Sequence, residues 1–548
     1  MDLYESLNLN ASRRNFIKVA GATALTGAAA AMLGGCSPKS GSSNKNNNAN
    51  SVSEIDWDEE TDVLIVGGGL AGNAAAATVA LEGNGAKALL LEKGTSEIGM
   101  GNSPFSAGRV LWTDDEHAEG FRKYLYELRG EMDNTPDAVL DAFAEGIHEN
   151  RTWMESLPDF NPDFVKFSEH FQKGSGETCY PEYAELEHAY NLGVMYFKDD
   201  TYDHVIKFVH HAFANNDNVT QKLEAPLTAL VQDPDTKAIL GGVYTYNNKT
   251  VYVKANKGVI MTCGGFENNA QMRGDYLSGT TARPIAGRMN TGDCHYICSR
   301  IGADMWHMNS CAGFWTSVSP IEGNDVTMRT PKQFGITVAV NGQRFFMDWD
   351  SDHEHDWDVI DNNPLTLNVG SRHGHMQFGG EWPHLPMPKT TWYILDDEGY
   401  QKMMAYETAP SFDPSSDGYG FTANSISELA EKTGMPADQL TKTVDLWNQY
   451  CEAGEDPAFH RPDWTLVPIK TAPFHACHCS TTLLNTDGGP RRNEKAQVID
   501  LNGDPIPNLY SAGEFGSVWC DMYNGGGNLG ECCAFGRIAV RNVLGLSK

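Results

Sequence analysis

The hydrophobic pattern near the start of the chain predicts a strand, a glycine turn, a helix and a second strand. The short, mostly apolar run TDVLIV from Thr61 to Val66 is typical of a buried parallel strand. Residues 67–72 read GGGLAG, and the small and apolar residues NAAAATVALEGNG that follow predict a helix. A second short strand, ALLLEK, ends at Glu92. This order predicts a parallel βαβ unit, which is the opening of an α/β fold.

The glycine spacing within this unit indicates dinucleotide binding. Gly67 permits a tight turn, Gly69 lets backbone N–H groups approach a pyrophosphate at the helix N-terminus, and Gly72 lets the helix pack against the strand. Glu92 stands where a ribose hydroxyl would lie. The glycine pattern alone is weak evidence, but here the strand, glycines, helix, second strand and acid occur in the required order.

A second glycine cluster lies near the C-terminus. Residues 521–531 read DMYNGGGNLGE, and the stretch ECCAFGRIAVRNVLG that follows from residue 531 predicts a helix. Consecutive glycines leave the backbone bare, so that it can lie close to a ligand. A hinge or a helix cap would account for one glycine but hardly for Gly525, Gly526 and Gly527 together.

Further segments resemble those of the fumarate reductase and 3-ketosteroid dehydrogenase superfamily of flavoproteins. They are GNSPFSAG at 101–108, KGVIMTCGGFENNAQM at 257–272, NTGDC at 290–294, NGQRF at 341–345 and PIPNLYSAGEFG at 505–516. They occur in the order of that family and cover the chain from about residue 60 to the end. The resemblance implies FAD as the cofactor and argues against NAD as the sole cofactor.

The resemblance also implies which residues bind the cofactor. It places Glu92 on the adenosine ribose, Glu514 near the ribityl chain and Asp293 close to the cofactor. In this family the last glycine loop lies against the flavin, and the next helix aims its N-terminus at the N1 and C2=O edge, where it stabilises the charge of reduced flavin. The implied cofactor-binding residues are Gly67, Gly69, Ala71, Gly72, Glu92, Lys93, Asn102, Ser103, Ala107, Gly108, Ala225, Asp293, Gly513, Glu514, Asn528 and Leu529.

The positions that grip substrate in fumarate reductases differ in this chain. Those enzymes place an arginine in the last glycine loop, a histidine before a T-x-G-G sequence, and a second arginine after N-G-x-R-F. This chain has YNGGGN in the loop, Leu484-Asn485 before Thr486, and FFMDWDSDHEHDWD after Arg344. Burying two unpaired carboxylates is costly. Fumarate is therefore not the expected substrate.

Tyr523 and Gly527 match instead the spacing of the ketosteroid dehydrogenase loop, where a tyrosine and the backbone N–H four residues later hold a ketone oxygen. In a reduction both groups would stabilise a developing enolate oxygen while hydride passes from the flavin to the β-carbon of an activated C=C bond. A packing role for Tyr523 is the alternative.

Arg372, His373 and His375 are the candidate proton donors, because they lie in the segment that the family uses as a mobile cap. The H-x-H spacings here and at His353 and His355 also leave a zinc site open. An exposed polar loop is the more common role for such a segment, and the family uses no metal there.

The FAD motifs stop near residue 293 and resume near 505, so the residues between them include an insertion. The predicted fold class is α/β, a Rossmann-like FAD-binding domain with an inserted α+β capping domain that closes over the substrate. We expect the FAD-binding domain at 56–307 and 471–548, and the capping domain at 308–470.

The first 55 residues predict export and tethering. SRRNFIK, before a small apolar run, looks like a twin-arginine signal over 1–35, and LGGC ending at Cys36 looks like a lipoprotein acylation site. The apolar run is shorter than the ~20 residues that a bilayer core requires. Residues 36–55 are polar and of low complexity, so they predict a flexible tether. We expect lipid anchoring to the outer face of the cytoplasmic membrane.

The net charge and the cysteine spacing bear on which molecules this protein binds and on how it receives electrons. A net charge of -31 argues against a broad basic face for nucleic acid. The 12 cysteines match neither an iron–sulfur spacing nor a haem attachment sequence, and most are expected to be buried free thiols. A cytochrome or flavin carrier at the membrane would then have to supply the electrons.

Three functions remain open from the sequence. The first is an exported flavin-dependent reductase of an activated C=C bond in a small organic acceptor, an enone or an unsaturated acid other than fumarate, that serves respiration. The second is a ketosteroid-type dehydrogenase working in the oxidative direction. The third is a flavin-containing binding lipoprotein without turnover.

Overall fold

The computed structural model describes most of the chain from Ile55 onward. The described residues are 55–129, 134–162, 165–167, 188, 191–197, 204–277, 283–318, 327–328, 334–346, 348, 388, 390–405, 413–416, 418–461, 463–520 and 523–546. The predicted export signal and tether lie outside these residues. Within them no helix is long and apolar enough to cross a membrane.

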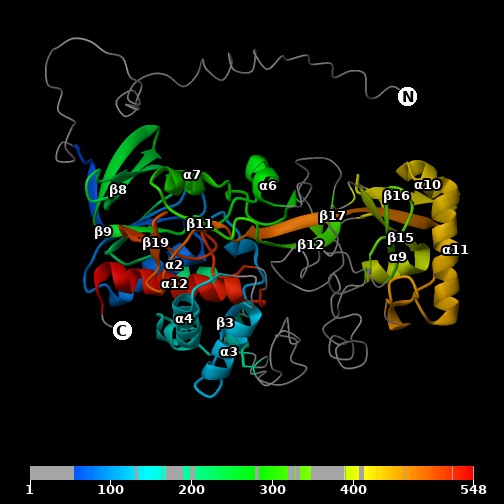
Figure 1. The fold of residues 1–548 in the computed structure, drawn as a ribbon, viewed down its shortest axis with the longest axis horizontal. Helices are drawn as coiled ribbons and strands as arrows, with labels where there is room; N and C mark the ends of the chain where they lie inside the picture. Colours follow the sequence, from blue (N-terminus) through cyan, green and yellow to red (C-terminus); the bar gives the residue numbers. More distant parts are fainter. Residues whose placement is uncertain are drawn as a thin grey trace, which may run out of the picture. The chain divides into compact units, whose positions relative to one another are not determined.

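The first sheet has eight strands, and its parallel centre contains the predicted βαβ unit (Figure 1). The order is β19-β20-β9-β1-β2-β6, and β7 and β8 extend the sheet from β9 in antiparallel fashion. β1 pairs in parallel with β2 and with β9, so that Val66 lies opposite both Leu91 and Met261. The strands are β1 (Glu59–Val66), β2 (Ala88–Leu91), β6 (Val219–Lys222), β7 (Leu227–Gln232), β8 (Ile239–Tyr246), β9 (Lys249–Met261), β19 (Gln497–Ile499) and β20 (Pro505–Ser511).

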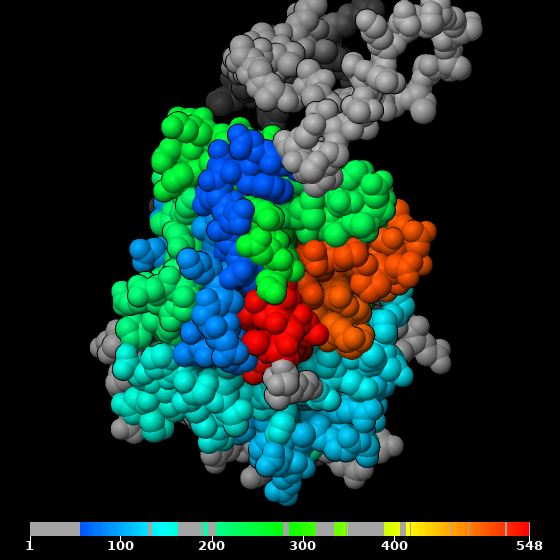
Figure 2. Space-filling model, turned by 90° about the vertical axis from the view of Figure 1, so that its left-hand side faces the viewer, coloured from blue at the N-terminus to red at the C-terminus, as the bar shows by residue number. Residues whose placement is uncertain are grey.

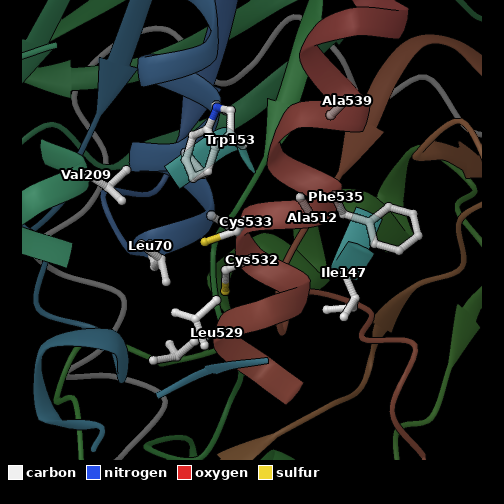
Figure 3. Close-up of a cluster of buried hydrophobic side chains, with 14 of the residues drawn as sticks. Leu70, Ile147, Trp153, Val209, Ala512, Leu529, Cys532, Cys533, Phe535 and Ala539 are labelled. Atoms are coloured by element: carbon white, nitrogen blue, oxygen red, sulfur yellow. The ribbon is translucent and has the colours of Figure 1, made fainter. Parts of the chain in front are cut away.

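Two helices from opposite ends of the chain pack together beside this sheet. They are α2 (Leu70–Glu82) and α12 (Gly527–Leu544). Their contact needs small residues, because a Cβ at Gly536 would lie only 2.9 Å from the carbonyl oxygen of Ala71. Figure 3 shows the buried cluster around α12, which includes Leu70 of α2. The C-terminal segment therefore completes the core around the βαβ unit, and Figure 2 shows C-terminal residues (red) beside N-terminal ones (blue).

A small helical layer holds the start of α12. It consists of α3 (Ala118–Arg129), α4 (Asp137–Ser156) and the sheet of β3 (Val110–Trp112), β4 (Val165–Phe167) and β5 (Gly193–Phe197). Asn150 Nδ2 of α4 donates to the carbonyl oxygens of Leu111 (2.9 Å) and Gly530 (3.2 Å). The first turn of α12 is thus fixed by side chains from the layer below it.

A second sheet of seven strands is built around the long strand β17 (Phe474–Thr486). Its core packs against α10 and α11, which gives this part an α+β composition. Its other elements are β10 (Arg283–Pro284), β12 (Cys311–Val318), β13 (Thr327–Met328), β14 (Ile336–Ala339), β15 (Thr391–Asp396), β16 (Gly420–Ala423), α9 (Asp397–Met404), α10 (Ile426–Thr433) and α11 (Ala437–Ala453).

The predicted α/β fold class is confirmed. β17 belongs to the second sheet although it follows residue 470, so this sheet includes residues beyond the expected end of the capping domain. The division into domains stays a prediction. The remaining elements are α5 (Val205–His211), α6 (Ala270–Tyr276), α7 (Asp293–Arg300), β11 (Met305–Trp306), β18 (Gly489–Pro490) and the 3₁₀ turns at Ser103–Phe105 and Asp463–Thr465.

The expectation of mostly buried free thiols also holds for the described part of the chain. Ten cysteines fall there, all of them free, and eight are buried. Cys263, Cys294 and Cys532 lie around the glycine turn that follows β1.

Candidate active site

The turn after β1 has the geometry expected for the glycine motif. Gly67 adopts a φ of +110°, and a Cβ there would overlap the carbonyl oxygen of Thr262. A Cβ at Gly72 would overlap the carbonyl oxygen of Gly67, so the helix can approach the strand only without one. Asn73 Nδ2 secures the turn by donating to the carbonyl oxygens of Gly68 (2.6 Å) and Gly69 (3.0 Å).

A cavity opens above this turn, at the carboxyl ends of β1, β2 and β9. It is lined by the N-terminus of α2, the start of α7 and the segment 512–514, which meet there from distant parts of the chain. Eleven of the predicted cofactor-binding residues line it: Gly67, Gly69, Ala71, Glu92, Lys93, Asn102, Ser103, Ala225, Asp293, Gly513 and Glu514.

Glu92 is buried at the end of β2, and its carboxylate organises the adjacent backbone. Oε2 accepts a hydrogen bond from Gly68 N (2.8 Å) and Oε1 accepts one from Gly94 N (2.6 Å). Each carboxylate oxygen has two lone pairs, so both can still accept a bond from a ligand hydroxyl. The position agrees with the predicted ribose contact.

Lys93 and Asp293 form an ion pair at the cavity wall. Lys93 Nζ donates to Asp293 Oδ2 (2.6 Å) and to Thr291 Oγ1 (2.7 Å). Partial burial alone would raise the pKa of Asp293, but the hydrogen bond and charge of Lys93 outweigh it and hold that pKa below its usual value. The pair joins the β2 end of the cavity to α7.

A group of polar residues lies at and behind the cavity wall, and the sequence pattern alone assigns no role to Glu267 and Asn290. Asn102 Nδ2 donates to both Glu267 Oε1 (2.5 Å) and Glu514 Oε2 (3.1 Å). Asn290 Nδ2 also donates to Glu267 Oε1 (2.7 Å). Glu267 and Asn290 fall inside the motif segments 257–272 and 290–294. Their place in those segments is the only sequence feature that could have predicted a role at the cofactor site.

His295 of α7 also lines the cavity. Its Nε2–H donates to the carbonyl oxygen of Gly488 (2.8 Å), and its ring meets those of Phe266 and Phe515 edge to face. Burial lowers the pKa of His295 to about 4. The ring is therefore neutral at physiological pH.

The loop before α12 brings Tyr523 to the start of that helix. The Tyr523 hydroxyl is 3.5 Å from Asn528 N, in the first turn of α12, and the Tyr523 side chain is buried. Its ring packs edge to face on Trp519, with centroids 5.5 Å apart at 85°. Tyr523 therefore lies beside the first turn of α12, and its joint action with Gly527 stays a prediction.

The glycines of this loop have structural reasons of their own. Gly526 adopts a φ of +83°, and its carbonyl oxygen accepts a hydrogen bond from Leu111 N (3.1 Å). A Cβ at Gly527 would lie 2.5 Å from the Trp519 ring. Glycine at 526 therefore allows the left-handed turn, and glycine at 527 leaves room for the indole ring of Trp519. The flavin contact expected from the sequence would be a further reason for these glycines.

Trp519 is positioned by a buried acid of α12. Glu531 accepts hydrogen bonds from Ser517 Oγ (2.6 Å) and Val518 N (3.0 Å) and forms a buried ion pair with Arg492. These bonds fix the segment that precedes Trp519. The predicted residues Asn528 and Leu529 occupy the first turn of α12, and Asn528 Oδ1 is buried with no hydrogen-bond partner among the described residues.

The remaining predicted residues fall into two groups. Gly72, Ala107, Gly108, Asn528, Leu529 and the Tyr523–Gly527 pair do not line the described cavity. Gly108 adopts a φ of +68°, and a Cβ at this position would lie 3.1 Å from the His204 ring. Arg372, His373 and His375 lie outside the described residues. Their role as proton donors and the alternative of a zinc site therefore stay predictions from the sequence.

Of the three positions that grip substrate in fumarate reductases, two hold neutral side chains within the described residues, and the third, the segment after Arg344, lies almost wholly outside them. Asn485 Nδ2 donates to Asp487 Oδ1 (2.9 Å). Arg344 is buried and forms a two-pronged ion pair with Asp456, at 3.1 and 2.8 Å. Tyr523 occupies the last glycine loop. None of these groups presents an unpaired cation.

The cavity fits an adenine dinucleotide on its own geometry. α2 begins at the cavity, and its N-cap Gly69 has no side chain; Leu70 N donates to Ser103 Oγ (3.0 Å), and this helix N-terminus and hydroxyl together suit a diphosphate. Glu92 stands at the adjoining strand end for a ribose, and glycines keep the floor bare. Together with the sheet order, these features define a dinucleotide-binding protein of the Rossmann type.

The family comparison agrees with this class. The family model described as FAD binding domain matches residues 62–529. The chain belongs to this family, and it is an FAD-dependent oxidoreductase.

Individual relatives cover most of the chain. Digoxin reductase of Eggerthella lenta is 27% identical, over 97% of this chain and 97% of its own length. A probable fumarate reductase of Shewanella frigidimarina is 26% identical, over 88% of this chain and 75% of its own. The 3-ketosteroid Δ1-dehydrogenase of Sterolibacterium denitrificans, solved with 1,4-androstadiene-3,17-dione, has the same fold, with a TM-score of 0.66 at 19% identity over 89% of this chain and all of that one.

Proposed function

We propose that this protein is a reductase of an activated C=C bond in a small organic acceptor, an enone or an unsaturated acid other than fumarate. The observation that carries the proposal is the neutral, aromatic surrounding of the last glycine loop. Tyr523 packs on Trp519 at the start of α12, and the loop contains no arginine or lysine. A ketone or ester oxygen suits such a site better than a pair of carboxylates.

The residues of the chain would act on the acceptor oxygen. FAD, when reduced, supplies hydride. The Tyr523 hydroxyl and the N–H groups at the start of α12 would donate to the carbonyl oxygen as negative charge builds up on it. The positive end of the helix dipole favours the same charge. A group of the segment around Arg372 would return the proton.

A second candidate is the oxidative reaction of a ketosteroid-type dehydrogenase. The fold shared with a 3-ketosteroid dehydrogenase supports it, because the same oxygen-holding groups serve both directions. The reductive direction is supported by digoxin reductase of Eggerthella lenta, which is 27% identical over 97% of this chain and 97% of its own length.

The proposal includes delivery of electrons from outside the protein. The sequence has no haem attachment motif and no iron–sulfur spacing, so a cytochrome or flavin carrier at the membrane is the proposed donor. The proposed place is the outer face of the cytoplasmic membrane, after twin-arginine export and acylation of Cys36. Incorporation of a labelled fatty acid that is lost in Cys36→Ser would support the anchor, and unchanged incorporation would refute it.

An anaerobic screen with an artificial electron donor tests the function. We expect neutral enones to be reduced, and Tyr523→Phe to lower kcat/KM by roughly tenfold to a hundredfold, since one hydrogen bond to a developing charge is lost. The exposed Tyr252 of β9 gives a matched control as Tyr252→Phe. An unimpaired Tyr523→Phe variant would remove Tyr523 from the mechanism, and oxidation of a saturated ketone without any reductase activity would favour the second candidate.

A further inference from the structure

Two carboxyl groups share one amide at the wall of the FAD cavity. Asn102 Nδ2 donates to Glu267 Oε1 and to Glu514 Oε2, at 2.5 and 3.1 Å. Glu267 is buried completely, and its Oε2 accepts a hydrogen bond from Thr486 Oγ1 (3.0 Å). Glu514 and Asn102 line the cavity itself. The two acids are therefore neighbours, one behind the wall and one facing the cofactor.

Two guanidinium groups lie near this pair but donate to backbone carbonyls, Arg273 to that of Glu267 (2.5 Å) and Arg492 to that of Gly513 (3.3 Å), and Arg492 is already paired with Glu531. The partners of Glu267 are amides and a hydroxyl, and neither acid forms an ion pair within the described part of the chain. Asp487 adds a third buried acid, held by Asn485 and Ser310.

Two ionised carboxylates in such a place would repel each other in a medium that screens poorly. Burial raises the pKa of Glu267. Burial, and then the charges of Glu267 and Asp487, raise the pKa of Glu514. The buried Cys532 thiol also faces Glu514, and burial and the charge of Glu514 raise its pKa, so it stays a neutral thiol and removes no charge. One proton shared between the acids relieves the repulsion.

FAD brings further negative charge to this cavity. Its diphosphate carries two negative charges, and the α2 N-terminus that would meet it, where Leu70 N donates to Ser103 Oγ, belongs to the same cavity as Glu514. Bound cofactor also replaces the water that solvates Glu514 in the open cavity. Both effects penalise a second ionised carboxylate.

We propose that Glu267 and Glu514 form an acid pair that takes up one proton when FAD binds. Asn102 positions both carboxyl groups for this exchange. The pair then holds a single negative charge beside the bound cofactor. Affinity for FAD becomes dependent on pH, because binding consumes a proton.

The direct test is a proton count on the native protein. Full-length apoprotein, prepared from the holoenzyme, is titrated with FAD by calorimetry between pH 7 and pH 9 in buffers of different ionisation enthalpy. We expect the uptake to approach one proton per FAD at the pH values where the apoprotein pair has lost its proton. The affinity should then fall about tenfold per pH unit, as linkage of one proton requires. A proton count of zero throughout the range would overturn the proposal.

Two amide variants identify the residues. Glu267→Gln and Glu514→Gln each leave one carboxyl group, which matches the charge of the singly protonated pair. Each should bind FAD with little or no proton uptake and with an affinity that varies little between pH 7 and pH 9. Either variant suffices if the other fails to fold.

The exposed Glu494 supplies the matched control, since Glu494→Gln makes the same chemical change at the surface and should retain the native proton count. A merely structural role would change affinity without changing the number of protons. Native proton uptake in both variants would refute the assignment.

Discussion

Gly527 offers a sharp test of how the loop before α12 is packed. In Gly527→Ala the added methyl would lie 2.5 to 2.7 Å from three atoms of the Trp519 ring. That ring cannot easily retreat, because Phe143 and Tyr523 both pack against it edge to face, with centroids 5.4 and 5.5 Å away. We expect the overlap to destabilise the protein and to displace Tyr523.

The size of the effect follows from two opposing terms. An extra methylene in a packed region costs ~1–3 kcal/mol, and alanine in place of glycine in a helix gains ~0.5–1 kcal/mol. Three ring atoms closer than 3.0 Å place the cost in the upper part of its range, so a net loss of about 1–2 kcal/mol is expected. Urea unfolding of the holoprotein, followed by tryptophan fluorescence, measures it.

A double-mutant cycle separates the overlap from other effects. Trp519→Phe shortens the ring, so Gly527→Ala should be nearly neutral or stabilising in that background. Gly274, inside α6, is the matched control, because a Cβ there meets nothing within 4 Å and Gly274→Ala should stabilise. An equal loss with Trp519 and with Phe at position 519 would refute the reasoning.

Three further predictions concern the cofactor site. Gly72→Ala should yield protein with little bound FAD, seen as loss of the yellow absorbance, because the methyl overlaps the Gly67 carbonyl and shifts the turn; full flavin content would contradict this. His295 is held neutral by burial with its pKa lowered to about 4, so the unfolded chain binds more protons between pH 6.5 and pH 4 and stability should fall as the pH drops through that window. The unfolding free energy should fall by about 3 kcal/mol over this window. If His295→Gln shows the same pH profile, His295 is not the cause of the pH dependence. NADH alone should reduce the flavin slowly, and rapid stoichiometric bleaching would remove the need for a separate electron donor.

The local elements were predictable because their signals are local. The strand, glycine turn and helix at 61–82 follow from hydrophobic pattern and backbone sterics, and the structure places β1 and α2 there. The predicted C-terminal helix is also present, but α12 begins at Gly527, four residues before the apolar stretch starts. Glycines are poor helix formers, and here tertiary contacts to β3 and α4 fix them in the first turn.

The acid pair was not predictable in the same way. Asn102, Glu267 and Glu514 stand far apart in the chain, and no periodicity joins them. Only the convergence of three loops on one cavity makes them neighbours. The reason for Gly527 was hidden likewise, since the pattern pointed to a ligand and the structure adds the Trp519 ring.

The central claim is that a neutral acceptor, not a dicarboxylate, is reduced beside Tyr523. The most direct measurement is a single-turnover experiment in which the fully reduced protein is mixed without oxygen with either a neutral polycyclic enone or fumarate, and flavin absorbance is followed. Each charge-assisted bond that fumarate lacks is worth ~1.5–3 kcal/mol, so we predict that the enone restores the oxidised flavin at least about a hundredfold faster. Equal or faster reoxidation by fumarate would contradict the account.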